Sequence, residues 1–146
     1  MIHYNFFESY KLLIIQYEGE ITEEELTQFI PFIFQDCRFF TLERAINDFR
    51  KTIFKFDIQN LENLITLRES FAKQFPIYRL VHLIDTVHQT TYSVFYNQLM
   101  KERNVNIATY TSLEAAIRFL GLSMTEKEME EKIRNLKYQF KPGNYE

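Results

Sequence analysis

The segment Lys11-Leu-Leu-Ile-Ile-Gln-Tyr-Glu18 contains four consecutive aliphatic side chains, more than a strand with one solvated face can bury. Such a run is typical of a strand that is covered on both faces. It predicts a sheet with helices packed above and below it. The preceding residues, Ile2 to Phe7, show an alternating pattern that predicts an antiparallel partner strand.

Helical and extended patterns alternate along the chain from this hairpin to Gly121. Apolar residues at helical spacing predict helices over 22–34, 57–75, 87–103 and 111–121. Extended patterns predict strands over 44–49, 78–84 and 105–109, with 52–56 also extended. We expect Gly19 to end the strand quoted above, and Pro31 to kink or split the first helix.

This order of elements predicts the fold class. Strands joined through single right-handed helical crossovers form a mostly parallel sheet with helices on its faces. We therefore expect a single α/β domain with four or five strands, mostly parallel, and an N-terminal antiparallel hairpin.

The chain changes character after Gly121. Thr125 and Glu128 form a capping box, and a narrow apolar stripe follows on a charged background. The stripe consists of Met129, Ile133, Leu136 and Phe140. These features predict a core domain over 1–121 and a C-terminal helical extension over 122–146. The stripe docks either on its own chain, which the short connection over 122–124 favours, or across the axis of a homodimer.

Composition excludes several classes of protein. Of the 146 residues only three are glycine, too far apart for a phosphate-binding loop, and one is cysteine, which excludes an internal disulfide and a multi-thiolate metal site. A net charge of −3 argues against nucleic-acid binding. The longest apolar run is far shorter than the roughly 20 residues that cross a bilayer. We expect a cytoplasmic protein without membrane insertion, cofactor or metal.

Four segments resemble those of a known family. They are Gly19-Glu-Ile-Thr-Glu-Glu-Glu-Leu26, Ala45-Ile-Asn-Asp-Phe-Arg50, Tyr78-Arg-Leu-Val-His-Leu-Ile-Asp85 and Tyr110-Thr-Ser-Leu-Glu-Ala-Ala-Ile-Arg-Phe-Leu120. They look like the small STAS-like proteins, relatives of the anti-sigma-factor antagonists and of the soluble domains of sulfate transporters. The resemblance covers about residues 2–121. It implies a bacterial, non-enzymatic regulatory domain that acts by contact with a protein partner.

The sequence departs from the family pattern at the regulatory turn of the family. The best understood members are switched by phosphorylation of a Ser in an Asp-Ser-Ser/Thr-Gly turn at the start of the second helix. The matching stretch, residues 48–60, contains neither Ser nor Gly, and Ile58 and Gln59 occupy the place of the phosphorylated hydroxyl. Asp57 is either a permanent negative charge in place of a phosphate or an ordinary helix cap, and we favour the cap.

The aromatic content of 16% is high and offers a candidate partner or ligand surface. The residues of this surface are Phe32, Phe34, Phe54, Phe56, Asp57, Tyr92 and Tyr96. If they are exposed together they form a protein interface or an apolar ligand cleft, and otherwise they belong to a Phe-rich core. The main hypothesis is regulation through protein contact. The alternative is binding of a small apolar, lipid-like molecule.

A second candidate site is polar and lies where the strands end, which is where α/β sheets bind ligands. It comprises Asp48, Arg50, Asp85 and His88. Paired carboxylates can do acid–base chemistry, but the sequence offers neither a nucleophile nor an anion hole beside them. His82 and Asp85 would point to opposite faces of an extended segment. We therefore predict neither a catalytic residue nor a metal ligand.

Overall fold

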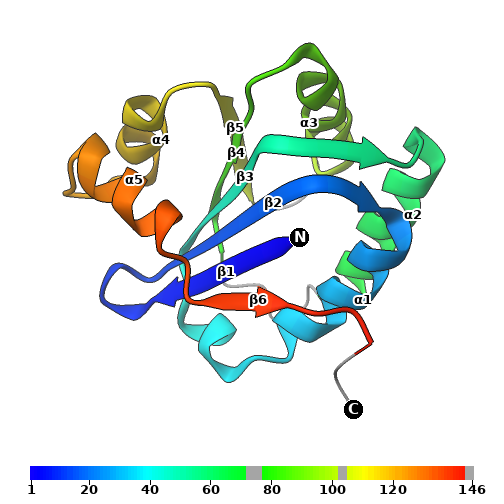
Figure 1. Ribbon diagram of the computed structural model, residues 1–146, viewed down its shortest axis with the longest axis horizontal. Helices are drawn as coiled ribbons and strands as arrows, with labels where there is room; N and C mark the ends of the chain where they lie inside the picture. The colour runs from blue at the N-terminus through cyan, green and yellow to red at the C-terminus, as the bar shows by residue number, and fades with distance from the viewer. Residues whose placement is uncertain (72–76, 102–104, 144–146) are drawn as a thin grey trace.

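The computed structural model describes residues 1–71, 77–101 and 105–143, and this part of the chain forms one α/β domain with a six-stranded sheet. The strands are β1 (Ile2–Phe7), β2 (Leu12–Thr22), β3 (Arg44–Lys55), β4 (Arg79–Leu83), β5 (Asn106–Tyr110) and β6 (Tyr138–Phe140). Their order in the sheet is β5-β4-β3-β2-β1-β6 (Figure 1). The strands from β2 to β5 are parallel, whereas β1 is antiparallel to both β2 and β6. The mostly parallel sheet agrees with the prediction, and the strand number exceeds it.

Helices cover both faces of the sheet (Figure 1). One face carries α1 (Glu23–Phe34), α2 (Ile58–Glu69) and α3 (Val87–Leu99). The other carries α4 (Leu113–Leu120) and α5 (Glu126–Arg134). Two short 3-10 helices, η1 (Glu8–Tyr10) and η2 (Cys37–Thr41), lie in the connections.

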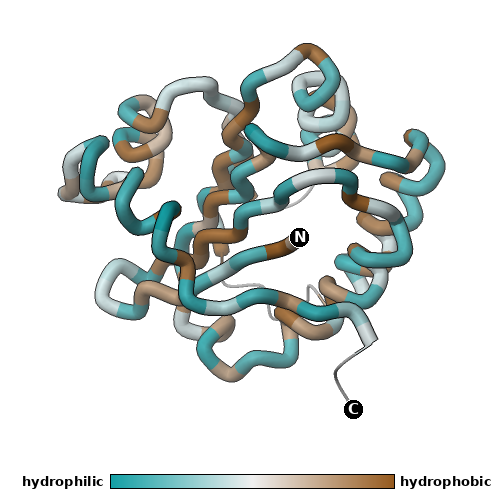
Figure 2. Tube along the Cα trace, in the orientation of Figure 1, coloured by the Kyte–Doolittle hydropathy of each residue, from teal (hydrophilic) through white to brown (hydrophobic). Residues whose placement is uncertain are grey.

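The aliphatic run in β2 divides its side chains between the two cores. Leu12 and Ile14 pack with α4 and α5, whereas Leu13 and Ile15 pack with the residues of α1 to α3. Successive side chains of a strand point to opposite faces, so only a strand buried on both faces can bury all four. Figure 2 shows apolar residues gathered in the central strands and a largely hydrophilic α5.

Several predicted element ends differ from the structure. β2 continues past Gly19, whose φ of +81° glycine tolerates, as far as Thr22. The helix α1 continues through Pro31 instead of splitting there. The extended segments predicted over 44–49 and 52–56 form one strand, β3. The helix α2 ends at Glu69, and the predicted end at 75, before Pro76, lies outside the described residues, as does residue 103 of the predicted third helix.

The C-terminal segment does not form one helix as predicted. The capping box at Thr125 is present, but α5 ends at Arg134 and the last position of the predicted stripe, Phe140, lies in β6. The edge of β1 explains the difference, because its free backbone groups gain hydrogen bonds when β6 pairs with them. Met129 and Phe140 therefore pack in the cores on opposite faces of the sheet.

The C-terminal segment docks on its own chain. Met129 and Ile133 are buried against α4 and the sheet. Arg38 donates a hydrogen bond to the Tyr138 hydroxyl (3.1 Å) and lies over the ring of Phe6, which ties β6 to its neighbours. The homodimer and the division at residue 121 stay predictions. No helix in the described ranges has the length and apolar character needed to cross a membrane.

We predict that ending the chain after Ser123 destabilises the protein. The change removes three buried apolar side chains, worth about 1.5–3 kcal/mol each before the entropy of ordering the segment is subtracted. We expect a melting temperature lower by several degrees and increased binding of a hydrophobic dye. A chain that ends at Gly143 is the control and should melt like the full chain. An unchanged melting temperature after the longer truncation would show that α5 and β6 contribute nothing to stability.

Candidate functional site

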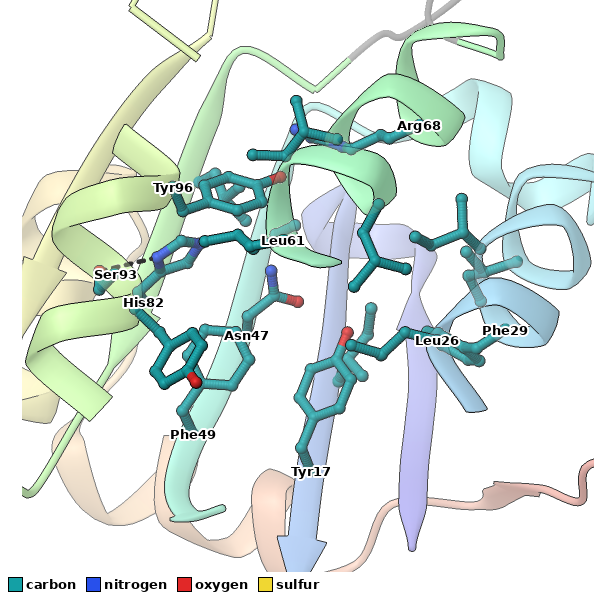
Figure 3. Close-up of a pocket in the computed structure, with 18 of the residues that line it drawn as sticks. Tyr17, Leu26, Phe29, Asn47, Phe49, Leu61, Arg68, His82, Ser93 and Tyr96 are labelled. Atoms are coloured by element: carbon teal, nitrogen blue, oxygen red, sulfur yellow. Dashed lines mark hydrogen bonds between the residues drawn. The ribbon is translucent and has the colours of Figure 1, made fainter. Parts of the chain in front are cut away.

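A cavity of about 130 Å³ lies between the sheet and the helices α1, α2 and α3. Its walls are mostly aromatic and aliphatic, as Figure 3 shows. The aromatic rings come from Tyr17, Phe29, Phe34, Phe39, Phe49, Phe54, Phe56, Tyr92 and Tyr96. The polar side chains at the wall include Asn47, Arg68, His82 and Ser93. The cavity is therefore apolar with a few polar groups in its wall.

The floor of the cavity is set by strand alternation. Ala45, Asn47 and Phe49 of β3 face the cavity, whereas Ile46 and Asp48 between them face the opposite side of the sheet. The parallel register places Asn47 of β3 directly beside His82 of β4. Two polar residues of adjacent strands thus lie side by side on the floor.

A bulge in β3 changes which of its residues face the cavity. Gln16 of β2 pairs with Asp48, but Glu18 pairs with Lys51, so β3 carries one extra residue between the two pairs. After this shift the even-numbered residues Phe54 and Phe56 face the cavity in place of the odd-numbered ones. The bulge therefore lets both halves of β3 supply aromatic side chains to one cavity.

The half of β3 beyond Asp48 lacks a strand on the side of β4, because β4 ends at Leu83 opposite Asp48. Side chains of α3 bind the backbone there instead. Gln89 donates from Nε2 to the carbonyl oxygens of Arg50 and Thr52, both at 3.1 Å. The backbone N–H of Phe54 donates to Nε2 of His88 (3.0 Å). The Tyr92 hydroxyl donates to the carbonyl oxygen of Phe56.

These contacts fix α3 over the cavity. Gln89 is 2% exposed, and its Oε1 also accepts hydrogen bonds from the backbone N–H groups of Asp85 and Thr86. One side chain thus satisfies four backbone groups that have no strand partner. We infer that Gln89 positions the N-terminus of α3 relative to β3.

His82 is a fully buried polar residue of the wall, 1% exposed. Its Nδ1 lies 2.9 Å from Oγ of Ser93, which lies 2.6 Å from Oγ1 of Thr109. Its Nε2 has no hydrogen-bond partner among the described residues. Burial, with a smaller contribution from the positive charge of Arg68, lowers the pKa of His82 to about 3. His82 is therefore neutral at physiological pH.

Most residues of the predicted aromatic surface face the interior of the protein. Phe34, Phe54 and Phe56 are buried, and together with Tyr92 and Tyr96 they line the cavity. Phe32 packs away from the cavity, against the rings of Tyr4, Phe29 and Phe140. Asp57 is exposed and caps α2 by accepting a hydrogen bond from the backbone N–H of Asn60 (2.9 Å). The aromatic residues are therefore gathered around an internal space.

The predicted polar site is only partly assembled. Asp48 is buried and accepts hydrogen bonds from Nε and Nη2 of Arg50, both at 2.9 Å. These hydrogen bonds to the Asp48 carboxylate raise the pKa of Arg50. Asp85 is exposed and contributes only a weaker electrostatic effect on Arg50. His88 belongs to α3, on the other face of the sheet from Asp48, and its Nε2 accepts from Phe54. Neither Asp48 nor Asp85, both within the described ranges, makes a hydrogen bond or ion pair with this imidazole.

Sequence reasoning missed several residues of the cavity wall, among them the polar residues Tyr17 and Asn47, and it assigned no role in binding to His82. One feature of the sequence could have indicated them. In each of the strands β2, β3 and β4, the face that lines the cavity carries one polar residue among apolar ones. Within the described ranges, no three His, Cys, Asp or Glu side chains gather as a metal site requires.

We predict that Gln89→Met lowers the free energy of unfolding by about 2 kcal/mol or more, because it leaves buried backbone groups without partners. Chemical denaturation measures the change. Gln98→Met on the exposed side of the same helix is the matched control and should change stability by less than about 0.5 kcal/mol. Equal effects of the two substitutions would contradict the positioning role of Gln89.

We predict that His82 makes the protein less stable in acid. Between pH 6.5 and about 3 the unfolded chain binds a proton at His82 that the folded chain excludes, so stability falls as the pH falls through this range. The contribution is about 2 kcal/mol between pH 6.5 and 5, at about 1.4 kcal/mol per pH unit. Denaturation of the wild type and of His82→Phe at both pH values measures it. Equal losses in the two proteins would contradict the assignment.

The chain was compared with protein families, curated proteins and solved structures. No protein-family model matches the chain, and no curated protein matches it. A solved structure of the anti-sigma factor antagonist SpoIIAA, in its unphosphorylated form, matches 92% of this chain and 99% of its own. The sequence identity is 14% and the TM-score is 0.48.

Proposed function

We propose that this protein binds a small, mostly apolar molecule in the cavity between its sheet and α1 to α3, without catalysing a reaction on it. One observation carries the proposal, the cavity of about 130 Å³ with its aromatic walls. Protein interiors are normally packed without voids of this size, and an empty one costs stability. A site that binds a ligand accounts for the space.

The volume limits the size of the ligand. An engineered apolar cavity of about 150 Å³ binds benzene, whereas pockets for drug-sized molecules measure about 300–1,000 Å³. The cavity described here therefore suits a molecule with about one ring. This narrows the lipid-like ligand, which was the alternative hypothesis from the sequence, to a compact apolar molecule.

The polar residues support binding over catalysis. Asp48 is held by Arg50, and His88 accepts a hydrogen bond from the backbone, so both groups serve the structure. In the cavity itself His82 lies between the rings of Phe49 and Tyr96, at centroid distances of 5.1 and 4.8 Å. A neutral imidazole between two rings, with no carboxylate beside it on the wall, is poorly suited to proton transfer.

Regulation through contact with a partner protein is our second proposal. Exposed apolar side chains support it, because Ile53 near the end of β3, Ile58 at the start of α2 and Val87 at the start of α3 are 49%, 40% and 84% exposed. Ile53 lies within the last residues of β3, whereas Ile58 and Val87 follow the carboxyl ends of the adjacent parallel strands β3 and β4. The topology therefore places all three toward one end of the sheet. Neither Ile58 nor Gln59 can be phosphorylated, so contact there would not use the family's serine switch.

Titration with toluene tests the first proposal. We expect backbone NMR signals of cavity-lining residues to shift, and the free energy of unfolding to rise by about 1.4 kcal/mol at a toluene concentration of ten times Kd. Ala45→Leu fills the cavity from the strand β3 and should abolish binding. Ala115→Leu adds the same bulk to α4, on the other face of the sheet, and should bind like the wild type. Shifts that are absent, or that survive in Ala45→Leu, would refute the proposal.

A further inference from the structure

Three polar side chains reach the cavity from three neighbouring strands, Tyr17 from β2, Asn47 from β3 and His82 from β4. Figure 3 shows them pointing toward a common space between the sheet and the helices. A few convergent polar groups in an otherwise apolar wall are typical of a site that binds and orients a small molecule.

All three side chains have polar atoms without protein partners. Nε2 of His82 has no partner in the described part of the chain. The side-chain amide of Asn47 and the hydroxyl of Tyr17 also make no hydrogen bond to any residue of the described ranges. Proteins rarely leave buried polar atoms unsatisfied, and Nε2 of His82 is such an atom, in the same cavity as the polar groups of Asn47 and Tyr17. The arrangement indicates that a group from outside the chain binds them.

The hydrogen-bonding properties of the three side chains indicate which kind of external group would bind them. Nδ1 of His82 and Oγ of Ser93 share one proton between them, so Nε2 is either a donor or an acceptor. Burial keeps His82 neutral by lowering its pKa to about 3, and it raises the pKa of Tyr17 so that its hydroxyl stays protonated. The amide of Asn47 and the hydroxyl of Tyr17 each donate and accept. A ligand hydroxyl matches all of them, because its single oxygen also does both.

We propose that the ligand is an uncharged single-ring molecule with one hydroxyl group, of the size and chemistry of phenol. Tyr17, Asn47 and His82 bind the hydroxyl, and the aromatic walls enclose the ring. This inference rests on the proposed function, to which it adds the chemical class of the ligand.

A carboxylate is a poorer match than a hydroxyl. An anion buried among neutral groups loses its hydration without gaining an opposite charge. The positive charge at the wall belongs to Arg68, whose Nη1 donates to the sulfur of Met100 (3.3 Å) and whose guanidinium lies 5.5 Å from the ring centre of Tyr96. Figure 3 places Arg68 beyond Tyr96, away from Asn47 and Tyr17.

Titrations with three ligands of similar size test the proposal: phenol, toluene and benzoate at pH 7, followed by NMR. In the wild type we expect phenol and toluene to bind in the cavity and benzoate to bind more weakly than phenol. Tyr17→Phe removes one oxygen and should weaken phenol binding about tenfold while changing toluene binding by less than twofold. Asn47→Leu and His82→Phe should shift the phenol-to-toluene preference in the same direction. Tyr110→Phe, on the α4 side of the sheet, is the matched control and should change neither affinity.

The outcomes separate this inference from the proposed function. If toluene binds but the Tyr17, Asn47 and His82 variants leave the phenol-to-toluene preference unchanged, the hydroxyl assignment is wrong and the apolar site stands. Tighter binding of benzoate than of phenol would also overturn the assignment, in favour of an anionic ligand near Arg68. If neither phenol nor toluene binds the wild type, the proposed function fails and this inference fails with it.

Discussion

The strand β3 extends beyond its neighbour β4, and the rest of the cavity depends on how its free edge is satisfied. The backbone past Asp48 would lack partners on that side, but Gln89, His88 and Tyr92 of α3 supply them. Because these side chains must reach β3, α3 is held at a fixed place above the sheet. The bulge opposite Gln16 then aligns Phe49 and Phe54 toward the space beneath it.

This arrangement explains why two residues with catalytic potential have structural roles. His88 replaces a strand partner as an acceptor, and Asp48 binds Arg50 on the opposite face of the sheet. In the described part of the chain, Nε2 of His82 is instead a buried polar atom without a partner, on the cavity floor beside Asn47. This observation supports the proposed recognition of a small polar group inside an apolar space.

The C-terminal segment stabilises this fold from its other side and edge. Met129 buries itself against α4, and β6 covers the backbone edge of β1, where Phe140 joins the core that contains the cavity. Within residues 122–143 no side chain lines the cavity, so this segment supports the sheet while α1, α2 and α3 enclose the cavity.

The sequence by itself determined the order of strands and helices, the helices on both faces and the caps at Thr22, Asp57 and Thr125, because periodicity and capping are local properties. It did not determine β6, because three residues are too few to show the alternating pattern of a strand. This strand forms only because the edge of β1 is free to pair with it. The convergence of Tyr17, Asn47 and His82 was also undetermined. It depends on the register between strands far apart in the chain, and only the tertiary structure fixes that register.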